Sequence, residues 1–247
     1  MVHQGAGRPS KPWRIWREPA EAILKRDRPD LAPLIDHALL DPHQGHEAIA
    51  RCCDEARHFG FAGVCVASRW VELAREKLPL SGSGKGQSPK LIAVVGFPFG
   101  AIPQRIKQAE AEAALEAGAD ELDVVPDFGA LADGNTTAVL DELAAICELD
   151  RPVKVILEAG RLAAEALALL VEISIDAGVR FLKSGSGFGP PVTVAQVQTL
   201  RDLARGRAAV KASGGIASLE HALDLVEAGA SRLGTSRGIA LMQALRA

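Results

Sequence analysis

The stretch Ala177-Gly-Val-Arg-Phe-Leu-Lys183 decides the fold, because it joins a helix end, a glycine turn and a short apolar strand. The same Ala-Gly ending recurs at Ala117–Ala119 and at Ala228–Ala230. A glycine just after a periodic apolar stretch is a typical helix stop. Repetition of helix, turn and strand predicts a parallel sheet, because parallel strands require long crossover connections.

Working outward from this stretch, short apolar runs alternate with Ala-rich amphipathic segments along most of the chain. We predict eight strands: Leu34–His37, Gly63–Ala67, Leu91–Val95, Glu121–Val125, Val153–Glu158, Arg180–Lys183, Ala209–Ala212 and Ser231–Gly234. Eight such units predict a (β/α)₈ TIM barrel, a single α/β domain over residues 31–247 behind an N-terminal extension over residues 1–30. An open, doubly wound sheet is the main rival, but no G-x-G-x-x-G motif follows the first strand.

The segments between the strands carry helix and loop signals. The helix before the first Ala-Gly-Ala turn is predicted to bury a stripe that includes Ile106, Ala113 and Ala114. The Ser- and Gly-rich stretch Leu80–Pro89 and the shorter Ala132–Thr137 are predicted loops. Neither loop has the character of a domain linker.

The composition excludes several classes of function. A net charge of −3, without long blocks of one sign, gives no footprint for nucleic acid or for an anionic membrane. No apolar run approaches the ~20 residues that span a bilayer, and the first 30 residues carry no apolar signal core. The four cysteines have neither disulfide-scaffold density nor zinc-site spacing, so we expect reduced thiols, no metal and a cytoplasmic location.

Two lysines stand where predicted strands end. Lys183 closes the sixth run and Lys211 lies at the end of the seventh, one residue before its last. The active sites of such barrels lie at the carboxyl ends of the strands. Neighbouring strands lie ~4.8 Å apart, so the two amines are expected to face each other. An ammonium beside another ammonium loses proton affinity, and a neutral lysine attacks carbonyl groups. The alternative is that one or both lysines are surface charges.

Carboxylates inside the apolar runs are the next candidates. Asp123 lies within an otherwise apolar strand, where an unpaired carboxylate is costly and needs a cationic partner. Near a Schiff base such a carboxylate can move protons. Asp36 at the end of the first strand, and Lys154 with Glu158 on one face of the fifth, extend this predicted network. The alternative for these last three is a structural ion-pair cage.

Glycines after the last two strands indicate an anion site. Gly214 and Gly215 follow the seventh strand, while Gly234, Ser236 and Arg237 lead into the last helix. Barrels frequently bind phosphate at these loops, where backbone N–H groups and a helix N-terminus are available. Either glycine group alone is weak evidence, because turns use glycine for conformational reasons.

The residues resemble the deoxyribose-phosphate aldolase family from about Leu34 to the last helix. The likeness is carried by Ile35-Asp-His-Ala-Leu-Leu40, Val64-Cys-Val66, Val95-Gly-Phe-Pro-Phe-Gly100, Gly118-Ala-Asp-Glu-Leu-Asp-Val-Val125, and Phe181-Leu-Lys-Ser-Gly-Ser-Gly187 with Val210-Lys-Ala-Ser-Gly-Gly215. The resemblance implies a cofactor-independent class I aldolase that reversibly splits 2-deoxy-D-ribose 5-phosphate into glyceraldehyde 3-phosphate and acetaldehyde. It also implies a homo-oligomer, a dimer or a tetramer.

The family's site residues carry over onto this sequence. The resemblance places the Schiff-base lysine at Lys183, the pKa-lowering lysine at Lys211, the proton-shuttling aspartate at Asp123 and an aspartate near the sugar hydroxyl at Asp36. The cysteine that the family has near the site falls on Cys65, for which we predict no catalytic role. The remaining predicted substrate-binding residues are Ser184, Ser186, Lys154 and Glu158, and Gly187 joins the predicted phosphate group.

The chain departs from the family pattern at several positions. Lys183-Ser-Gly-Ser-Gly187 replaces the usual Lys-Thr-Ser-Thr-Gly, and alanines at 38, 159 and 217 replace two threonines and an arginine. We hypothesise that Arg237 supplies the cation that Ala217 lacks. Two alternatives remain open: a lysine-dependent aldolase for another aldehyde or keto acid, and a catalytically silent barrel that binds sugar phosphates.

Overall fold

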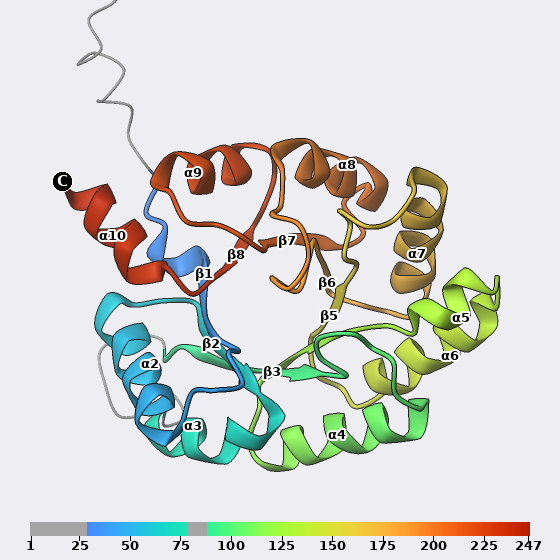
Figure 1. Ribbon diagram of the computed structural model, residues 1–247, viewed down its shortest axis with the longest axis horizontal. Coiled ribbons are helices and arrows are strands. Elements are labelled where there is room, and N and C mark those ends of the chain that lie inside the picture. The colour runs from blue at the N-terminus through green and yellow to red at the C-terminus, as the bar shows by residue number, and fades with distance from the viewer. Residues whose placement is uncertain (1–28, 79–87) are drawn as a thin grey trace, which may run out of the picture.

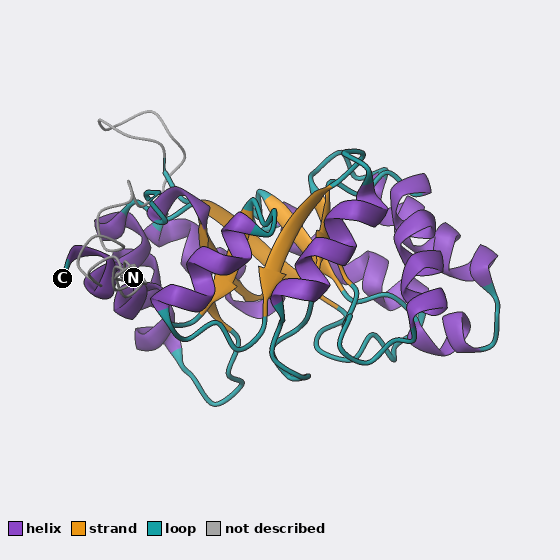
Figure 2. Ribbon diagram, turned by 90° about the horizontal axis from the view of Figure 1, so that it is seen from above, coloured by secondary structure: helices purple, strands orange, loops and turns teal. Residues whose placement is uncertain are grey.

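The strands form a closed parallel barrel in which each strand pairs with its neighbours in sequence, and β8 closes onto β1. The computed structural model describes residues 29–78 and 88–247. Figure 1 shows the barrel strands ringed by helices, and Figure 2 shows the strands as the central layer seen from the side. The predicted TIM barrel is confirmed. The predicted extension over residues 1–30 and the loop Leu80–Pro89 lie almost wholly outside the described residues.

Each predicted run coincides with one observed strand, with ends that differ by at most two residues. The strands are β1 (Ile35–Leu39), β2 (Gly63–Ala67), β3 (Lys90–Val95), β4 (Glu121–Val124), β5 (Val153–Ile156), β6 (Phe181–Lys183), β7 (Ala209–Ser213) and β8 (Arg232–Thr235). The helices are α2 (His46–Phe59), α3 (Val71–Lys77), α4 (Gln104–Glu116), α5 (Phe128–Ala132), α6 (Thr136–Cys147), α7 (Ala164–Asp176), α8 (Val194–Ala204), α9 (Leu219–Glu227) and α10 (Gly238–Arg246), with 3₁₀ turns at Ala32–Leu34 and Ser68–Trp70. The predicted loop Ala132–Thr137 spans the turn between α5 and α6.

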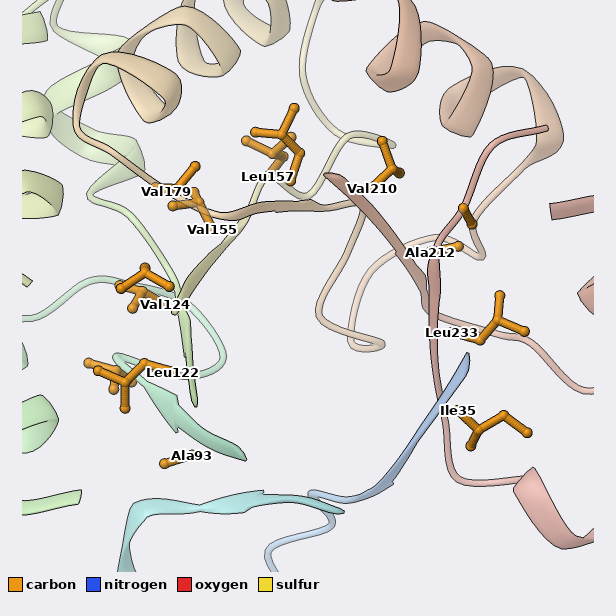
Figure 3. Packing of buried hydrophobic residues seen from close by; sticks show 14 of the residues in the cluster. Ile35, Ala93, Leu122, Val124, Val155, Leu157, Val179, Val210, Ala212 and Leu233 are labelled. Atoms are coloured by element: carbon orange, nitrogen blue, oxygen red, sulfur yellow. The ribbon is translucent and has the colours of Figure 1, made fainter. Parts of the chain in front are cut away.

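The main hydrophobic core lies between the barrel and its helices. Alternate residues of a strand face opposite sides, so Leu122 and Val124 of β4 point outward with Val155 of β5 and Val210 of β7. Figure 3 shows these side chains on the outer side of the strand ring. Because the outward positions hold the apolar side chains, the inward positions remain available for other chemistry.

The interior of the barrel has an apolar side and a charged side. Cys65, Ile92 and Val94 form a small buried cluster on β2 and β3. The inward positions of β1 and of β4 to β8 carry charged residues instead, of which Asp36, Asp123, Lys154 and Lys211 are fully buried. This division places the ionisable groups of six strands within reach of one another.

Helix α4 buries a different face from the predicted one. Lys107, Ala111 and Ala114 are buried, whereas Ile106 is 44% exposed. Only Ala114 of the named stripe therefore faces the core, and the prediction for the rest was wrong. The reason is a fully buried ion pair, in which Lys107 Nζ lies 2.7 Å from Glu142 Oε1 of α6. A lysine with a buried carboxylate partner occupies a core position that its residue type does not indicate.

Candidate active site

Lys183 and Lys211 lie side by side inside the barrel. Their Cα atoms are register partners between β6 and β7, and the residues are 2% and 0% exposed. Both Nζ atoms donate to Oδ2 of Asp123 at 2.8 Å. The alternative that these lysines are surface charges is therefore wrong for both.

Asp123 on β4 is the acceptor at the centre of the site. Its other oxygen, Oδ1, accepts from Lys154 Nζ at 2.8 Å, so three ammonium groups surround one carboxylate. Burial alone would raise the pKa of Asp123, but Lys154, Lys183 and Lys211 outweigh it and hold the pKa well below its usual value. Asp123 is thus an anion and an acceptor at neutral pH.

Asp36 lies deeper in the barrel than predicted, because β1 continues to Leu39 and places it near the start of the strand. Its Oδ2 is 2.6 Å from Lys211 Nζ, a contact outside hydrogen-bond geometry and so an ion pair only. Its Oδ1 pairs with Arg232 of β8. Burial acts to raise the pKa of Asp36, yet Lys211, Lys154 and Arg232 lower it overall.

Sequence reasoning missed two members of the site, Glu121 and Arg232. Glu121 Oε2 lies 2.7 Å from Lys154 Nζ, and Glu121 Oε1 lies 3.4 Å from Arg232 Nη2. The period-two rule carried the signal, because Glu121 precedes Asp123 by two residues on β4 and so shares its face. We refer to the following seven residues as the barrel cluster: Asp36, Glu121, Asp123, Lys154, Lys183, Lys211 and Arg232.

The other two lysines of the barrel cluster are held as cations. Burial lowers the pKa of Lys154 and of Lys211, but Asp123 and Asp36 reverse this effect and raise both values overall. Lys154 is fully buried and does not line the pocket described below. Lys211 is therefore a fixed positive charge beside Lys183.

Glu158 lies outside the barrel cluster. Strand β5 ends at Ile156, and Glu158 has a left-handed backbone with φ of 47°, so the strand alternation that linked it to Lys154 no longer applies. Its Oε2 instead accepts from Ser186 Oγ at 2.5 Å. Glu158 and Ser186 line a second pocket together with the exposed rings of Phe99 and Phe188.

Ser184 bridges β6 and β7. Its hydroxyl donates to the carbonyl oxygen of Ser213 at 3.0 Å and accepts from the Ser213 amide at 2.9 Å. With both bonds made, the hydroxyl fixes the end of β6 just after Lys183. Any contact of Ser184 with substrate stays a prediction.

A pocket of about 410 Å³ opens at the carboxyl ends of the strands, within the ~300–1,000 Å³ range of small-molecule sites. Both Lys183 and Lys211 line it. Its wall also contains every residue of the predicted phosphate group, which are Gly187, Gly214, Gly215, Gly234, Ser236 and Arg237. Residues predicted separately, as nucleophile and as anion site, are therefore brought to one cavity.

The glycines of this wall also have conformational and steric reasons to be glycine. Gly215 has φ of 71°, and a Cβ there would approach Pro191 Cβ to 2.7 Å. A Cβ on Gly234 would approach Ser213 Cβ to 2.8 Å. Glycine at these positions is required for the turn and for the close approach of β7 and β8, whatever the pocket binds.

The three alanines that depart from the family pattern lie in two kinds of environment. Ala38 and Ala217 line the pocket, so these two positions of its wall lack the hydroxyl and the guanidinium that the family pattern implies. Ala159 is buried just past β5 and does not line the pocket.

Cys65 lies 3.9 Å from Asp123 Oδ2, and burial raises the pKa of its thiol to about 11. Cys65 therefore stays a thiol at neutral pH.

The barrel cluster is expected to make the free energy of unfolding fall as the pH becomes acidic. A carboxyl group with a lowered pKa contributes stability above its unfolded value of ~3.9, and this is lost as pH falls through the folded value. Asp36 and Asp123 are such groups. We expect the free energy of unfolding to fall by about 2 kcal/mol or more between pH 5 and pH 3, measured by urea titration. An Asp36→Asn variant should show a shallower slope, and equal slopes would contradict the assignment.

Within residues 29–78 and 88–247, no grouping of His, Cys, Asp and Glu is suited to hold a metal ion. In the same part of the chain, no helix is both long enough and apolar enough to cross a bilayer.

A buried amine beside a second, positively charged lysine at the mouth of a β/α barrel fits the class of Schiff-base aldolases. No protein-family profile matches the chain. The chain is 47% identical over 223 residues to the deoxyribose-phosphate aldolase of Thermosynechococcus vestitus, covering 90% of this chain and 100% of that one. It is 41% identical over 222 residues to the enzyme of Thermococcus gammatolerans, covering 88% and 97%. The chain therefore belongs to the deoxyribose-phosphate aldolase family.

Solved structures agree with this assignment. A deoxyribose phosphate aldolase from Aeropyrum pernix, described as having a unique tetrameric structure, superposes with a TM-score of 0.78 at 34% identity, covering 88% of this chain and 91% of that one. A structure described as QR15, an aldolase, superposes with a TM-score of 0.81 at 36% identity, covering 88% and 96%.

Proposed function

We propose that this chain is a class I aldolase that reversibly cleaves 2-deoxy-D-ribose 5-phosphate to D-glyceraldehyde 3-phosphate and acetaldehyde. The observation that carries the proposal is the buried amine of Lys183, which reaches the same pocket as the predicted phosphate-binding residues. Membership of the deoxyribose-phosphate aldolase family supports the choice of substrate.

Lys183 is the best candidate for the nucleophile because its amine pairs with the fewest carboxylates. Within the described residues Lys183 has one carboxylate partner, Asp123, whereas Lys211 pairs with both Asp123 and Asp36. Lys154 also has two carboxylate partners and does not reach the pocket. Lys183 can therefore leave its carboxylate and attack a carbonyl carbon with the smallest loss of pairing.

The reaction begins at the C1 aldehyde of the open-chain sugar. The amine of Lys183 adds to this carbon and gives a carbinolamine. Asp123 and a water molecule carry the proton that lets the hydroxyl leave as water, and an iminium ion forms. The positive iminium nitrogen is then the electron sink for the next step.

Carbon–carbon cleavage follows from the iminium ion. The C3 hydroxyl loses its proton, the C2–C3 bond breaks, and its electron pair moves toward nitrogen to form an enamine. Glyceraldehyde 3-phosphate leaves, with C3 as its aldehyde carbon. Protonation of the enamine at C2 and hydrolysis by water release acetaldehyde and return the free amine of Lys183.

Arg237 is proposed to bind the phosphate group in place of the family arginine that is Ala217 here. Its side chain lines the pocket at the start of α10 and has no carboxylate partner among the described residues. Arg237→Ala should raise KM for deoxyribose 5-phosphate about tenfold, equivalent to ~1.4 kcal/mol, with little change for unphosphorylated deoxyribose. Arg246→Ala, at the far end of the same helix, is the matched control. An unchanged KM in Arg237→Ala would refute the assignment.

A retro-aldol assay tests the function itself. Purified protein is expected to release glyceraldehyde 3-phosphate from deoxyribose 5-phosphate, and to prefer this substrate over a panel of other aldehydes and keto acids. Preference for a keto acid would support the alternative aldolase. Absence of turnover, combined with thermal stabilisation by phosphate, would support the silent binding barrel.

We also propose that the chain forms a homo-oligomer, a dimer or a tetramer. The tetrameric relative from Aeropyrum pernix supports this. The expected partners are otherwise the sugar phosphate and acetaldehyde alone, and the cytoplasmic location stays a prediction.

A further inference from the structure

The proposed mechanism gives no task to Arg232 or to Glu121, two members of the barrel cluster that meet each other. Arg232 pairs with Asp36 through Nη1 and lies 3.4 Å from Glu121 through Nη2. Its guanidinium carbon also lies 6.0 Å from the ring centre of Phe181. The Arg232 side chain is 16% exposed, so solvent screens it little. A largely covered cation in the barrel interior needs a reason beyond substrate contact, because Arg232 does not line the pocket.

The charges of the barrel cluster do not balance. Asp36, Glu121 and Asp123 are its three acids, while its four bases are Lys154, Lys183, Lys211 and Arg232. With every group ionised, one positive charge is left without a counter-charge in a buried site. Burial disfavours an unbalanced charge, so loss of one proton stabilises the cluster.

The count of charges takes in the inward-facing groups of all eight strands. The inward groups are Asp36 on β1, Cys65 on β2, Glu121 and Asp123 on β4, Lys154 on β5, Lys183 on β6, Lys211 on β7 and Arg232 on β8, whereas β3 contributes the apolar Ile92 and Val94. Cys65 stays neutral, as described above. Arg232 keeps its proton under all ordinary conditions, which leaves the three lysines to supply the proton that is lost.

We infer that Arg232 is a positioning residue that, as the fourth cation against three carboxylates, favours transfer of a proton away from Lys183 and so the reactive form of its amine. The effect passes through Asp36 and Lys211, because Arg232 binds the carboxylate that Lys211 also uses and is the register partner of Lys211. Lys211 and Lys154 each keep two carboxylates, so the proton leaves Lys183. This inference rests on the proposed function, in which Lys183 is the nucleophile.

Two substitutions should move the reactivity of Lys183 in opposite directions. Arg232→Met removes one cation, so three ammonium groups then balance three carboxylates and Lys183 keeps its proton to higher pH. Glu121→Gln removes one anion, which increases the excess positive charge and frees the amine at lower pH. Arg232→Lys keeps the charge and changes only the shape.

The test is the pH dependence of trapping by acetaldehyde and cyanoborohydride, with the adduct quantified on the Lys183 peptide. Acetaldehyde has no titratable group of its own. The pH of half-maximal trapping should rise by about one unit in Arg232→Met and fall by about one unit in Glu121→Gln, and should stay unchanged in Arg232→Lys. Arg75→Met is the matched control, because Arg75 pairs with Asp120 outside the barrel and its side chain is 17% exposed.

The outcomes separate this inference from the proposed function. An active wild type with its adduct on Lys183, but with variants that shift together or do not shift, would overturn the role of Arg232 alone. A wild type without an adduct on Lys183 would overturn the proposed function. If Arg232→Met does not fold, the direction of the Glu121→Gln shift decides.

Discussion

Replacing Lys183 with alanine is expected to lower kcat/KM for deoxyribose 5-phosphate by on the order of 10⁴-fold or more. The loss is large because both the carbinolamine and the iminium ion are bonded to this nitrogen, and no other amine in the pocket is as free to replace it. Lys211 is restrained by Asp36 and Asp123 at 2.6 and 2.8 Å. The measurement is the steady-state rate of glyceraldehyde 3-phosphate release.

Two controls separate chemistry from folding. Lys183→Arg keeps the cation near Asp123 but cannot form an imine, so it should be as inactive as the alanine variant while retaining more stability. Lys107→Met removes another fully buried lysine, which pairs with Glu142 outside the barrel, and should lose stability but keep turnover per folded molecule. Activity of Lys183→Ala within tenfold of the wild type would rule out Lys183 as the nucleophile.

Asp123→Asn is expected to cost about 3–5 kcal/mol of unfolding free energy at pH 7, and to reduce kcat about 100-fold. The carboxylate accepts from three buried ammonium groups, so its removal leaves positive charge in the barrel without a counter-charge. The same change removes the group that moves protons at the carbinolamine. Urea titration and steady-state kinetics measure the two effects separately.

Asp120→Asn is the matched control for this prediction. Asp120 also pairs with a cation, Arg75 at 2.7 Å, but its side chain is 25% exposed and lies outside the barrel. Its loss should cost no more than about 2 kcal/mol and leave kcat unchanged. If Asp123→Asn behaved like Asp120→Asn, the three lysines would have to be held by something other than Asp123.

The fold and the centre of the site follow from the sequence because strands in a barrel are short and end in characteristic residues. Lys183 ends an apolar run immediately before a glycine-rich stretch, and the rule that barrel sites lie at strand ends identifies it. The closed order of the sheet makes β6 and β7 neighbours, and their observed register pairs Lys183 with Lys211. Asp123 is conspicuous because a carboxylate interrupts an apolar strand.

The remaining features depend on contacts between distant parts of the chain. Glu121 and Arg232 meet across the barrel, 111 residues apart in sequence. The period-two rule places Glu121 on the face of Asp123, but no local pattern places Arg232 beside it. The period-two rule gave the wrong position for Glu158 because β5 ends two residues earlier. Lys107 takes a core position only because Glu142 of another helix lies opposite it. In each case a tertiary partner, absent from the local sequence, determines where the side chain lies.

The most direct test of a reactive Lys183 is covalent capture with acetaldehyde and borohydride, followed by peptide mapping of the modified residue. The expected result is one ethyl group per chain, attached to Lys183 and absent from the Lys183→Ala variant. Attachment to Lys211 or Lys154, or no attachment in a folded protein that cleaves the sugar phosphate, would contradict the Schiff-base assignment.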